Sequence, residues 1–153
     1  KTPEAAEEII SEAVMKFRRR YDVPVEITIP DELMLIPMDA ILIEQVIVNL
    51  LENSVLHGKT TTLIKLTLSS DGENAVFSVA DNGSGINEKK LPMLFSGYFI
   101  HAEEQSGDVK RNMGIGLSVC LTIIKAHGGT MTAGNLPEGG AEFTFTLPLE
   151  RAL

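Results

Sequence analysis

Apolar residues recur at every fourth position near the start of the chain, and charged residues occupy most of the positions between them. The apolar set is Ala5, Ile9, Ala13 and Phe17. This spacing predicts an amphipathic helix over residues 4–20. A second helix is predicted over residues 39–57, which are dense in Ile, Leu and Val and contain no Gly or Pro before Gly58.

Alternating apolar segments predict the strands. Residues 25–29 alternate between two prolines, and residues 61–68 and 75–80 flank the turn signal Asp71-Gly72, which predicts a hairpin. Residues 130–133 and 142–147 surround a turn at 136–140 and predict two last strands. A short helix is predicted over 88–95 and a longer one over 115–127, which ends at Gly128-Gly129.

Residues 96–113 are polar and predict a loop that is long enough to suggest a function. The order of the elements predicts an α+β fold, with a mixed and mostly antiparallel sheet and helices packed on one face. At 153 residues with 44% hydrophobic content, the chain is expected to form one domain around one core.

Charge and composition exclude some classes of protein. The net charge is −8 and no block of Lys and Arg is present, which argues against a nucleic-acid surface. One cysteine, Cys120, favours a reducing compartment, so we expect a cytoplasmic domain. No run approaches 18 apolar residues and the start is acidic, so we expect no direct membrane contact. Because Lys1 is not an initiator methionine, a longer parent chain is compatible with the sequence.

Polar residues interrupt the apolar 39–57 helix on one face. Gln45, Asn49, Glu52 and Asn53 share that face by their spacing. Asn is a poor helix former, so two of them call for an explanation. One explanation is a solvated stripe, and the other is a set of oxygen ligands for Mg²⁺ beside substrate phosphates.

Two glycine-containing segments carry further candidate chemistry. Asp81 ends a predicted strand and precedes Gly83 and Gly85; its carboxylate can select a ligand donor such as an exocyclic amine, although Asp-Asn-Gly is also an ordinary turn. Residues 114–117 (Gly-Ile-Gly-Leu) stand where the polar loop meets a predicted helix. Such a junction suits phosphate binding, and a plain hinge is the alternative. The segment Gly58-Lys59-Thr60 does not complete a P-loop, because Asn53 stands where the first glycine is required.

In this order, the motifs resemble those of the histidine kinase catalytic domains of the GHKL superfamily. Residues 49–54 resemble its N box, 81–86 its G1 box, 94–99 its F box, 114–118 its G2 box and 127–148 its closing segment. The resemblance covers about residues 4–149 and implies the two-layer α/β sandwich of the Bergerat fold. Within the family, residues 135–141 look most like the potassium-sensor kinases.

The resemblance implies the site. Asn53 and Asn49 would hold Mg²⁺ against the triphosphate of ATP, and Asp81 would accept the adenine amine. Residues 96–113 would form a flexible ATP lid. The remaining implied nucleotide contacts are His57, Gly83, Gly85, Ile86, Gly114, Ile115, Gly116, Leu117 and Thr144.

Two residues depart from the family pattern. Leu56 replaces a usual Lys of the N box, so the resemblance implies either weaker ATP binding or a substitute phosphate contact from Lys110 or Arg111. Asn112 replaces the usual first glycine of the G2 box, which predicts a stiffer lid hinge.

The resemblance implies transfer of the γ-phosphoryl group to a histidine on a separate dimerisation domain, and then signalling to a response regulator. The parent chain is expected to be membrane-anchored. Asn49 stands where gyrase-like ATPases carry a Glu that acts as general base, so hydrolysis is disfavoured, with Glu44 and Glu52 as fallback bases. A nucleotide-dependent regulatory module and an anti-sigma serine kinase on the same fold remain as alternatives.

Overall fold

The structure, a computed structural model, describes residues 1–95 and 108–149, and of residues 108–115 it describes the backbone alone. Five strands form the main sheet in the order β2-β4-β5-β7-β6. They are β2 (Val25–Thr28), β4 (Ile64–Ser70), β5 (Asn74–Asp81), β6 (Met131–Asn135) and β7 (Ala141–Pro148). Only β2 and β4 pair in parallel among the described strands, so the sheet is mixed and mostly antiparallel, as predicted.

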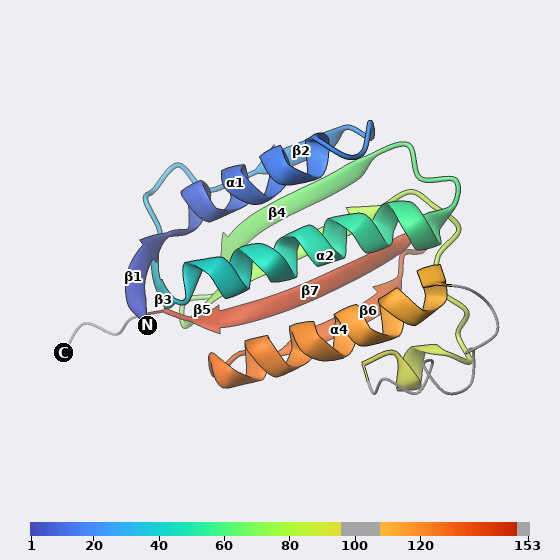
Figure 1. The fold of residues 1–153 in the computed structure, drawn as a ribbon. Coiled ribbons are helices and arrows are strands. Elements are labelled where there is room, and N and C mark those ends of the chain that lie inside the picture. The colour runs from blue at the N-terminus through green and yellow to red at the C-terminus, as the bar shows by residue number, and fades with distance from the viewer. Residues whose placement is uncertain (96–107, 150–153) are drawn as a thin grey trace.

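Three long helices cover one face of this sheet (Figure 1). They are α1 (Ala6–Arg18), α2 (Ala40–Gly58) and α4 (Asp108–Ala126). The central helix α2 contacts both α1 and α4. The architecture is therefore the expected two-layer α/β sandwich.

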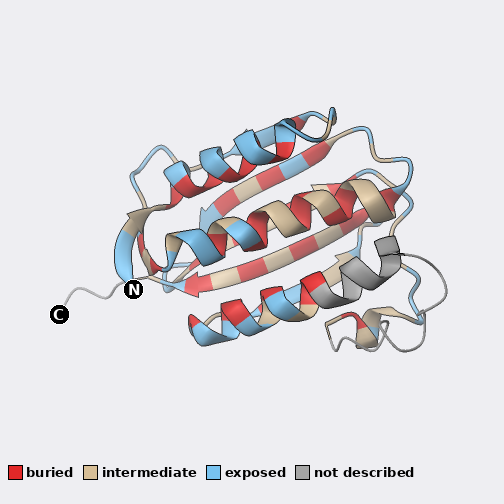
Figure 2. Ribbon diagram, viewed as in Figure 1, coloured by how far each residue is buried: buried red, intermediate tan, exposed pale blue. Residues whose placement is uncertain are grey.

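The core lies between the helix layer and the sheet. Buried residues alternate along β5 and β7, so one face of each strand points to the helices (Figure 2). Phe77 and Phe145 stack there with ring centroids 4.5 Å apart. The apolar stripe of α2, from Ile43 to Leu51, is buried on the same side.

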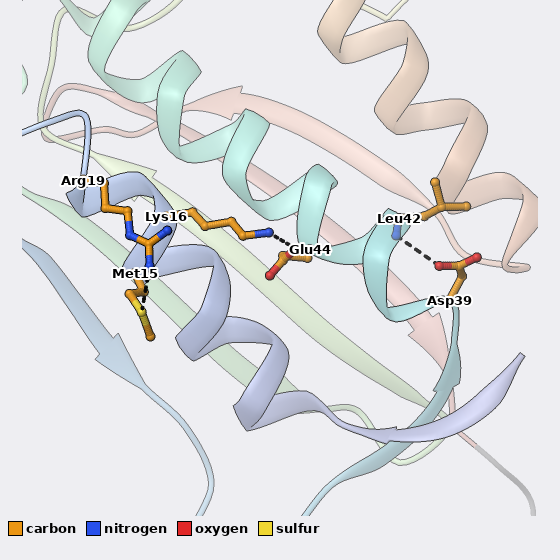
Figure 3. Close-up of polar contacts among 6 residues, drawn as sticks. All are labelled: Met15, Lys16, Arg19, Asp39, Leu42 and Glu44. Atoms are coloured by element: carbon orange, nitrogen blue, oxygen red, sulfur yellow. Dashed lines mark hydrogen bonds and ion pairs between the residues drawn. The ribbon is translucent and has the colours of Figure 1, made fainter.

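Helix α2 begins where its sequence predicts. Asp39 is its N-cap, and the carboxylate accepts a hydrogen bond from the Leu42 backbone N–H at 3.2 Å (Figure 3). Among the described helices, α2 alone is long and apolar enough to cross a membrane by length and composition. Its buried side packs on the sheet and its flanks contact α1 and α4, which places it as the central helix of this domain.

Several boundaries differ from the predictions. A small second sheet pairs β1 (Thr2–Ala5) with β3 (Leu35–Met38), and neither strand was predicted. Pro3 and Pro37 face each other in this pair, and proline within a short strand weakens the strand pattern. The expected 88–95 helix is reduced to the 3₁₀ turn η1 (Leu91–Met93).

The strand predicted over 61–68 starts three residues later, at Ile64. The Oδ1 atom of Asn82 accepts the backbone N–H groups of Thr62 and Leu63, at 2.9 and 3.1 Å. A side chain therefore occupies the donors that a longer strand would need, and it ties the start of β4 to the segment after β5.

Candidate functional site

Asn53 lies on α2 and faces a small cavity between this helix and the sheet. Its side chain is 7% exposed, and the Nδ2 atom is buried without a hydrogen-bond partner among the described residues. Buried amides are nearly always paired, so an orphaned one indicates a place for a ligand group. The cavity is lined by Asn53, His57, Gly58, Asp81, Gly85, Ile86, Ala141 and Phe143.

Asp81 lies across the same cavity at the end of β5 and is 6% exposed. Its Oδ1 atom accepts the backbone N–H of Gly83 at 2.9 Å and that of Ala141 at 3.2 Å. No hydrogen bond from the described residues reaches Oδ2. One carboxylate oxygen thus anchors the group, and the other retains acceptor capacity for a ligand donor.

Gly83 serves the fold rather than the cavity surface. A Cβ atom at this position would lie 2.6 Å from Gly58 Cα, and the neighbouring Ser84 N–H donates to Gly58 O at 2.9 Å. The turn after β5 therefore docks on the C-terminus of α2. The group that approaches Gly83 closely is therefore the protein itself, at Gly58.

Asn49 lies one helical turn before Asn53 and packs against α4. Its Oδ1 atom is 3.2 Å from the place where a Cβ atom of Gly116 would stand, and its Nδ2 atom donates to Cys120 Sγ at 3.6 Å. Gly116 and Cys120 are one turn apart, so the Asn49 amide lies along that face of α4. The glycine makes room for the amide, and the thiol orients it.

The helix predicted over 115–127 begins at Asp108, seven residues earlier. Gly116 and Leu117 therefore lie inside α4 and not at a helix N-terminus, and Leu117 is fully buried in the core. The prediction of a phosphate site built from the first N–H groups of a helix at 114–117 is wrong. The glycines suggested a boundary because each costs about 1 kcal/mol relative to Ala inside a helix. At Gly116 the absence of a side chain leaves room for the Asn49 amide of α2.

Part of the predicted site lies outside the described residues. Residues 96–107 of the expected lid belong to that part, whereas 108–113 are helical instead of looped. Lys110, Arg111, Asn112, Gly114 and Ile115 stand on α4, and their side chains are outside the described part of the chain. Leu56 is half-buried near the end of α2.

The structure does not bring Thr144 to the cavity. On β7 it pairs with Ser78 and Thr132 and alternates with the buried Phe143 and Phe145. Alternation turns its side chain to the sheet face opposite the helices, whereas Phe143 lines the cavity. The expected adenine contact of Thr144 is therefore wrong. The apolar Phe143 and Phe145 on either side of it could have indicated this, because residues on a strand alternate between the two faces of the sheet.

Two residues that the sequence analysis missed hold the site from β6 and β7. Ala141 supplies the second backbone donor to Asp81. Asn135 bonds to Ile86, which lines the cavity. Neither residue type predicts such a role, because one member of each bond is a backbone group and the two partners are distant in sequence.

The two candidate general bases are held by residues of α1 and of the segment that follows it. Glu44 forms an ion pair with Lys16 at 2.8 Å (Figure 3), and Glu52 accepts a hydrogen bond from Tyr21 Oη at 3.0 Å. Arg20 lies 3.7 Å from the same Glu52 oxygen. Burial, then the hydrogen bond to Glu52, raises the pKa of Tyr21. Of the predicted polar stripe, only Asn49 and Asn53 point toward the α4 and cavity side, and Gln45 is exposed.

Comparison with known proteins agrees with this geometry. Residues 38–151 match the family of histidine kinase-, DNA gyrase B- and HSP90-like ATPases. The chain belongs to this family. It is 36% identical to the sensor protein KdpD of Clostridium acetobutylicum over 98% of the chain, and 35% identical to KdpD of Escherichia coli over 95%. The chain spans 17% and 16% of the length of these two relatives.

The solved catalytic domain of histidine kinase ThkA has the same fold. It matches with a TM-score of 0.80 and 27% identity, over 97% of each chain. These likenesses confirm the GHKL fold, and they assign the chain to the catalytic ATP-binding domains of sensor histidine kinases, with the expected likeness to KdpD.

Proposed function

We propose that this domain binds Mg-ATP in the cavity between α2 and the sheet and transfers the γ-phosphoryl group to a histidine of a separate dimerisation domain. The observation that carries the proposal is that Asn53 of α2 and Asp81 of β5 line the same cavity. Among the described residues, the buried Nδ2 atom of Asn53 has no hydrogen-bond partner and one carboxylate oxygen of Asp81 receives no hydrogen bond. The domain would comprise residues 1–153, with a core over 4–149 and a lid within 96–113.

The two polar groups suit the two ends of ATP. Asp81 would accept the exocyclic amine of adenine, with Gly85 and Ile86 beside the base. Asn53 and Asn49 would hold Mg²⁺ through their amide oxygens, which are hard ligands of the type this ion prefers. When bound, the ion would neutralise phosphate charge. His57, which lines the cavity near Asn53, would contact a phosphate.

Transfer to a protein fits the site better than hydrolysis. Asn49 carries an amide that cannot accept a proton from water. Glu44 and Glu52 are engaged by Lys16 and Tyr21 of the neighbouring α1 segment, so neither carboxylate is turned to the cavity. Phosphoryl transfer needs mainly positioning and electrostatic stabilisation, which the amides and backbone donors can supply.

The partners follow from the reaction. The acceptor would be the histidine-bearing dimerisation domain of the same parent chain, and a response regulator would receive the phosphoryl group afterwards. We place this domain in the cytoplasm and its parent at the membrane, in line with its likeness to sensor proteins. A nucleic-acid partner is not proposed, because the net charge is −8.

Calorimetry followed by a transfer assay tests the proposal. The chain should bind ATP with Mg²⁺ more tightly than with EDTA, and Asn53→Ala should remove the Mg²⁺ dependence. Gln45→Ala, on the same helix face but exposed, is the matched control and should bind as the parent does.

An added helical hairpin that carries the acceptor histidine should gain an acid-labile, base-stable label. ATP binding without transfer to any acceptor would favour a regulatory nucleotide module. An acid-stable label on an added serine protein would favour an anti-sigma kinase.

A further inference from the structure

Asn135, the last residue of β6, is bound to Ile86 by two hydrogen bonds. Its Oδ1 atom accepts the Ile86 backbone N–H at 2.7 Å, and its Nδ2 atom donates to the Ile86 carbonyl at 2.8 Å. One side-chain amide thus satisfies both backbone groups of one residue, in the way a neighbouring strand would. The loop that follows β5 is thereby fixed at Ile86 to the β6–β7 hairpin.

Gly85 adapts the loop to this contact. Its φ angle is +80°, a conformation that favours glycine. A Cβ atom there would lie 2.8 Å from Asn135 Oδ1, so a larger residue would displace the amide. The glycine and the asparagine therefore act as one unit at the cavity wall.

The same hairpin holds the opposite wall of the cavity. Asn135 is the register partner of Ala141, and the Ala141 N–H donates to Asp81 Oδ1. Gly140, with φ of +94°, lies so close to the Asp81 carbonyl that a side chain would have no room. The hairpin thus contacts Ile86 on one side and Asp81 on the other, and it sets the distance between them.

We propose that Asn135 is a positioning residue that sets selectivity for the adenine base by holding Ile86 at a defined distance from Asp81. The inference rests on the proposed binding of ATP in this cavity. Asn135 does not line the cavity, so it acts through Ile86. The amides proposed for the metal, Asn49 and Asn53, lie on α2, and among the described residues no side-chain hydrogen bond joins them to the hairpin.

This separation predicts a selective effect. Without the Asn135 amide, ligands that carry adenine should bind more weakly, and the preference for ATP over GTP should shrink. Binding of Mg²⁺ with inorganic tripolyphosphate should not change, because that ligand lacks a base. General destabilisation of the domain would instead weaken all three ligands.

The experiment compares Asn135→Ala and Asn135→Asp with the control Asn87→Ala. Asn87 lies one residue after Ile86. Among the described residues its hydrogen bonds stay within its own turn, where its side chain accepts the Lys89 N–H at 2.9 Å and its carbonyl accepts the Lys90 N–H at 2.9 Å. Calorimetry with ATP, GTP and tripolyphosphate gives the affinities, and amide hydrogen exchange at Ile86 reports the contact itself.

Asn135→Ala should bind ATP about tenfold more weakly, in keeping with two lost hydrogen bonds, and the Ile86 amide should exchange faster while core amides do not. Asn135→Asp keeps the acceptor for the Ile86 N–H, so its ATP affinity should lie between those of the parent and Asn135→Ala. Unchanged ATP affinity and selectivity in Asn135→Ala, with a parent that binds ATP, would overturn this inference alone. A parent chain that binds no ATP would overturn the proposed function and this inference with it.

Discussion

The Asn49 side chain donates a hydrogen bond to the thiol of Cys120, which is fully buried on α4. The two residues are 71 positions apart in sequence, and their contact joins the helix that carries the candidate metal ligands to the helix that follows the lid segment. The contact places the Cys120 thiol, a titratable group, next to the candidate site. The dependence of stability on pH can therefore test whether this thiol is buried.

Cys120 should make the domain less stable at high pH. Burial raises the pKa of its thiol to about 12, with a smaller opposing effect from the Asn49 hydrogen bond, whereas the unfolded chain ionises near its ordinary value of 9.0. Above that pH the unfolded state binds fewer protons than the native state. The free energy of unfolding should therefore fall by up to about 1.4 kcal/mol for each pH unit between the two values.

Urea unfolding of the parent and of Cys120→Ala at pH 8 and pH 10 measures this effect. The variant is expected to be less stable at both pH values, because the thiol fills the core. The thiol is tested by the change in the free energy of unfolding between pH 8 and pH 10, which should be larger in the parent than in Cys120→Ala. An identical change in both proteins would contradict a buried, protonated thiol.

Asp81→Asn should reduce the preference for ATP over GTP while the fold is retained. The amide oxygen can still accept the Gly83 and Ala141 N–H groups, so the anchor survives. The second position becomes an NH₂ group, which presents a donor to the adenine amine. Losing one charge-assisted hydrogen bond should cost roughly 1.5–3 kcal/mol of binding free energy. Calorimetry of both nucleotides decides the matter, and a parent with equal affinity for ATP and GTP would refute the role of Asp81.

Gly83→Ala should destabilise the domain by about 1–3 kcal/mol through overpacking. The added methyl group would meet the backbone of Gly58, which cannot move without shifting the end of α2. Gly134→Ala is the matched control, because nothing lies within 4 Å of its added Cβ atom. Thermal unfolding of both variants should show the loss in Gly83→Ala alone, and equal midpoints would mean that the turn does not dock on α2.

Asn49→Glu should raise the rate of ATP hydrolysis by the isolated chain, which is expected to be slow in the parent. A well-placed general base contributes about 10² to 10⁴-fold, and the parent has an amide at this position. Asn49→Gln has the length of Glu without its basicity and serves as the control. A steady-state phosphate-release assay separates the two. Rapid hydrolysis by the parent itself would instead point to a gyrase-like ATPase.

The start of α4 and the orientation of Thr144 show where the local sequence pattern was insufficient. Gly114 and Gly116 predicted the start of a helix, because glycine has a low helix propensity, yet α4 continues through both residues. At Gly116 the missing side chain leaves room for the Asn49 amide of α2. Thr144 was assigned by its place in a motif, whereas its orientation follows from the pairing of β7. Both predictions required knowledge of the tertiary contacts of the residue, which are made by elements distant in sequence.

By itself, the sequence determined the helices and strands around the site and the residues with ligand chemistry on them, because these depend on spacings of two, three or four residues. Asn49 and Asn53 share a helix face, and Asp81 ends a strand, in any fold that contains those elements. Only the tertiary structure decided how the walls of the cavity are joined. Ile86 is held by Asn135, 49 residues away, and Asp81 by Ala141, 60 residues away. These bonds join side chains to backbone groups, which every residue carries, so no local pattern distinguishes the partners and only the folded sheet selects them.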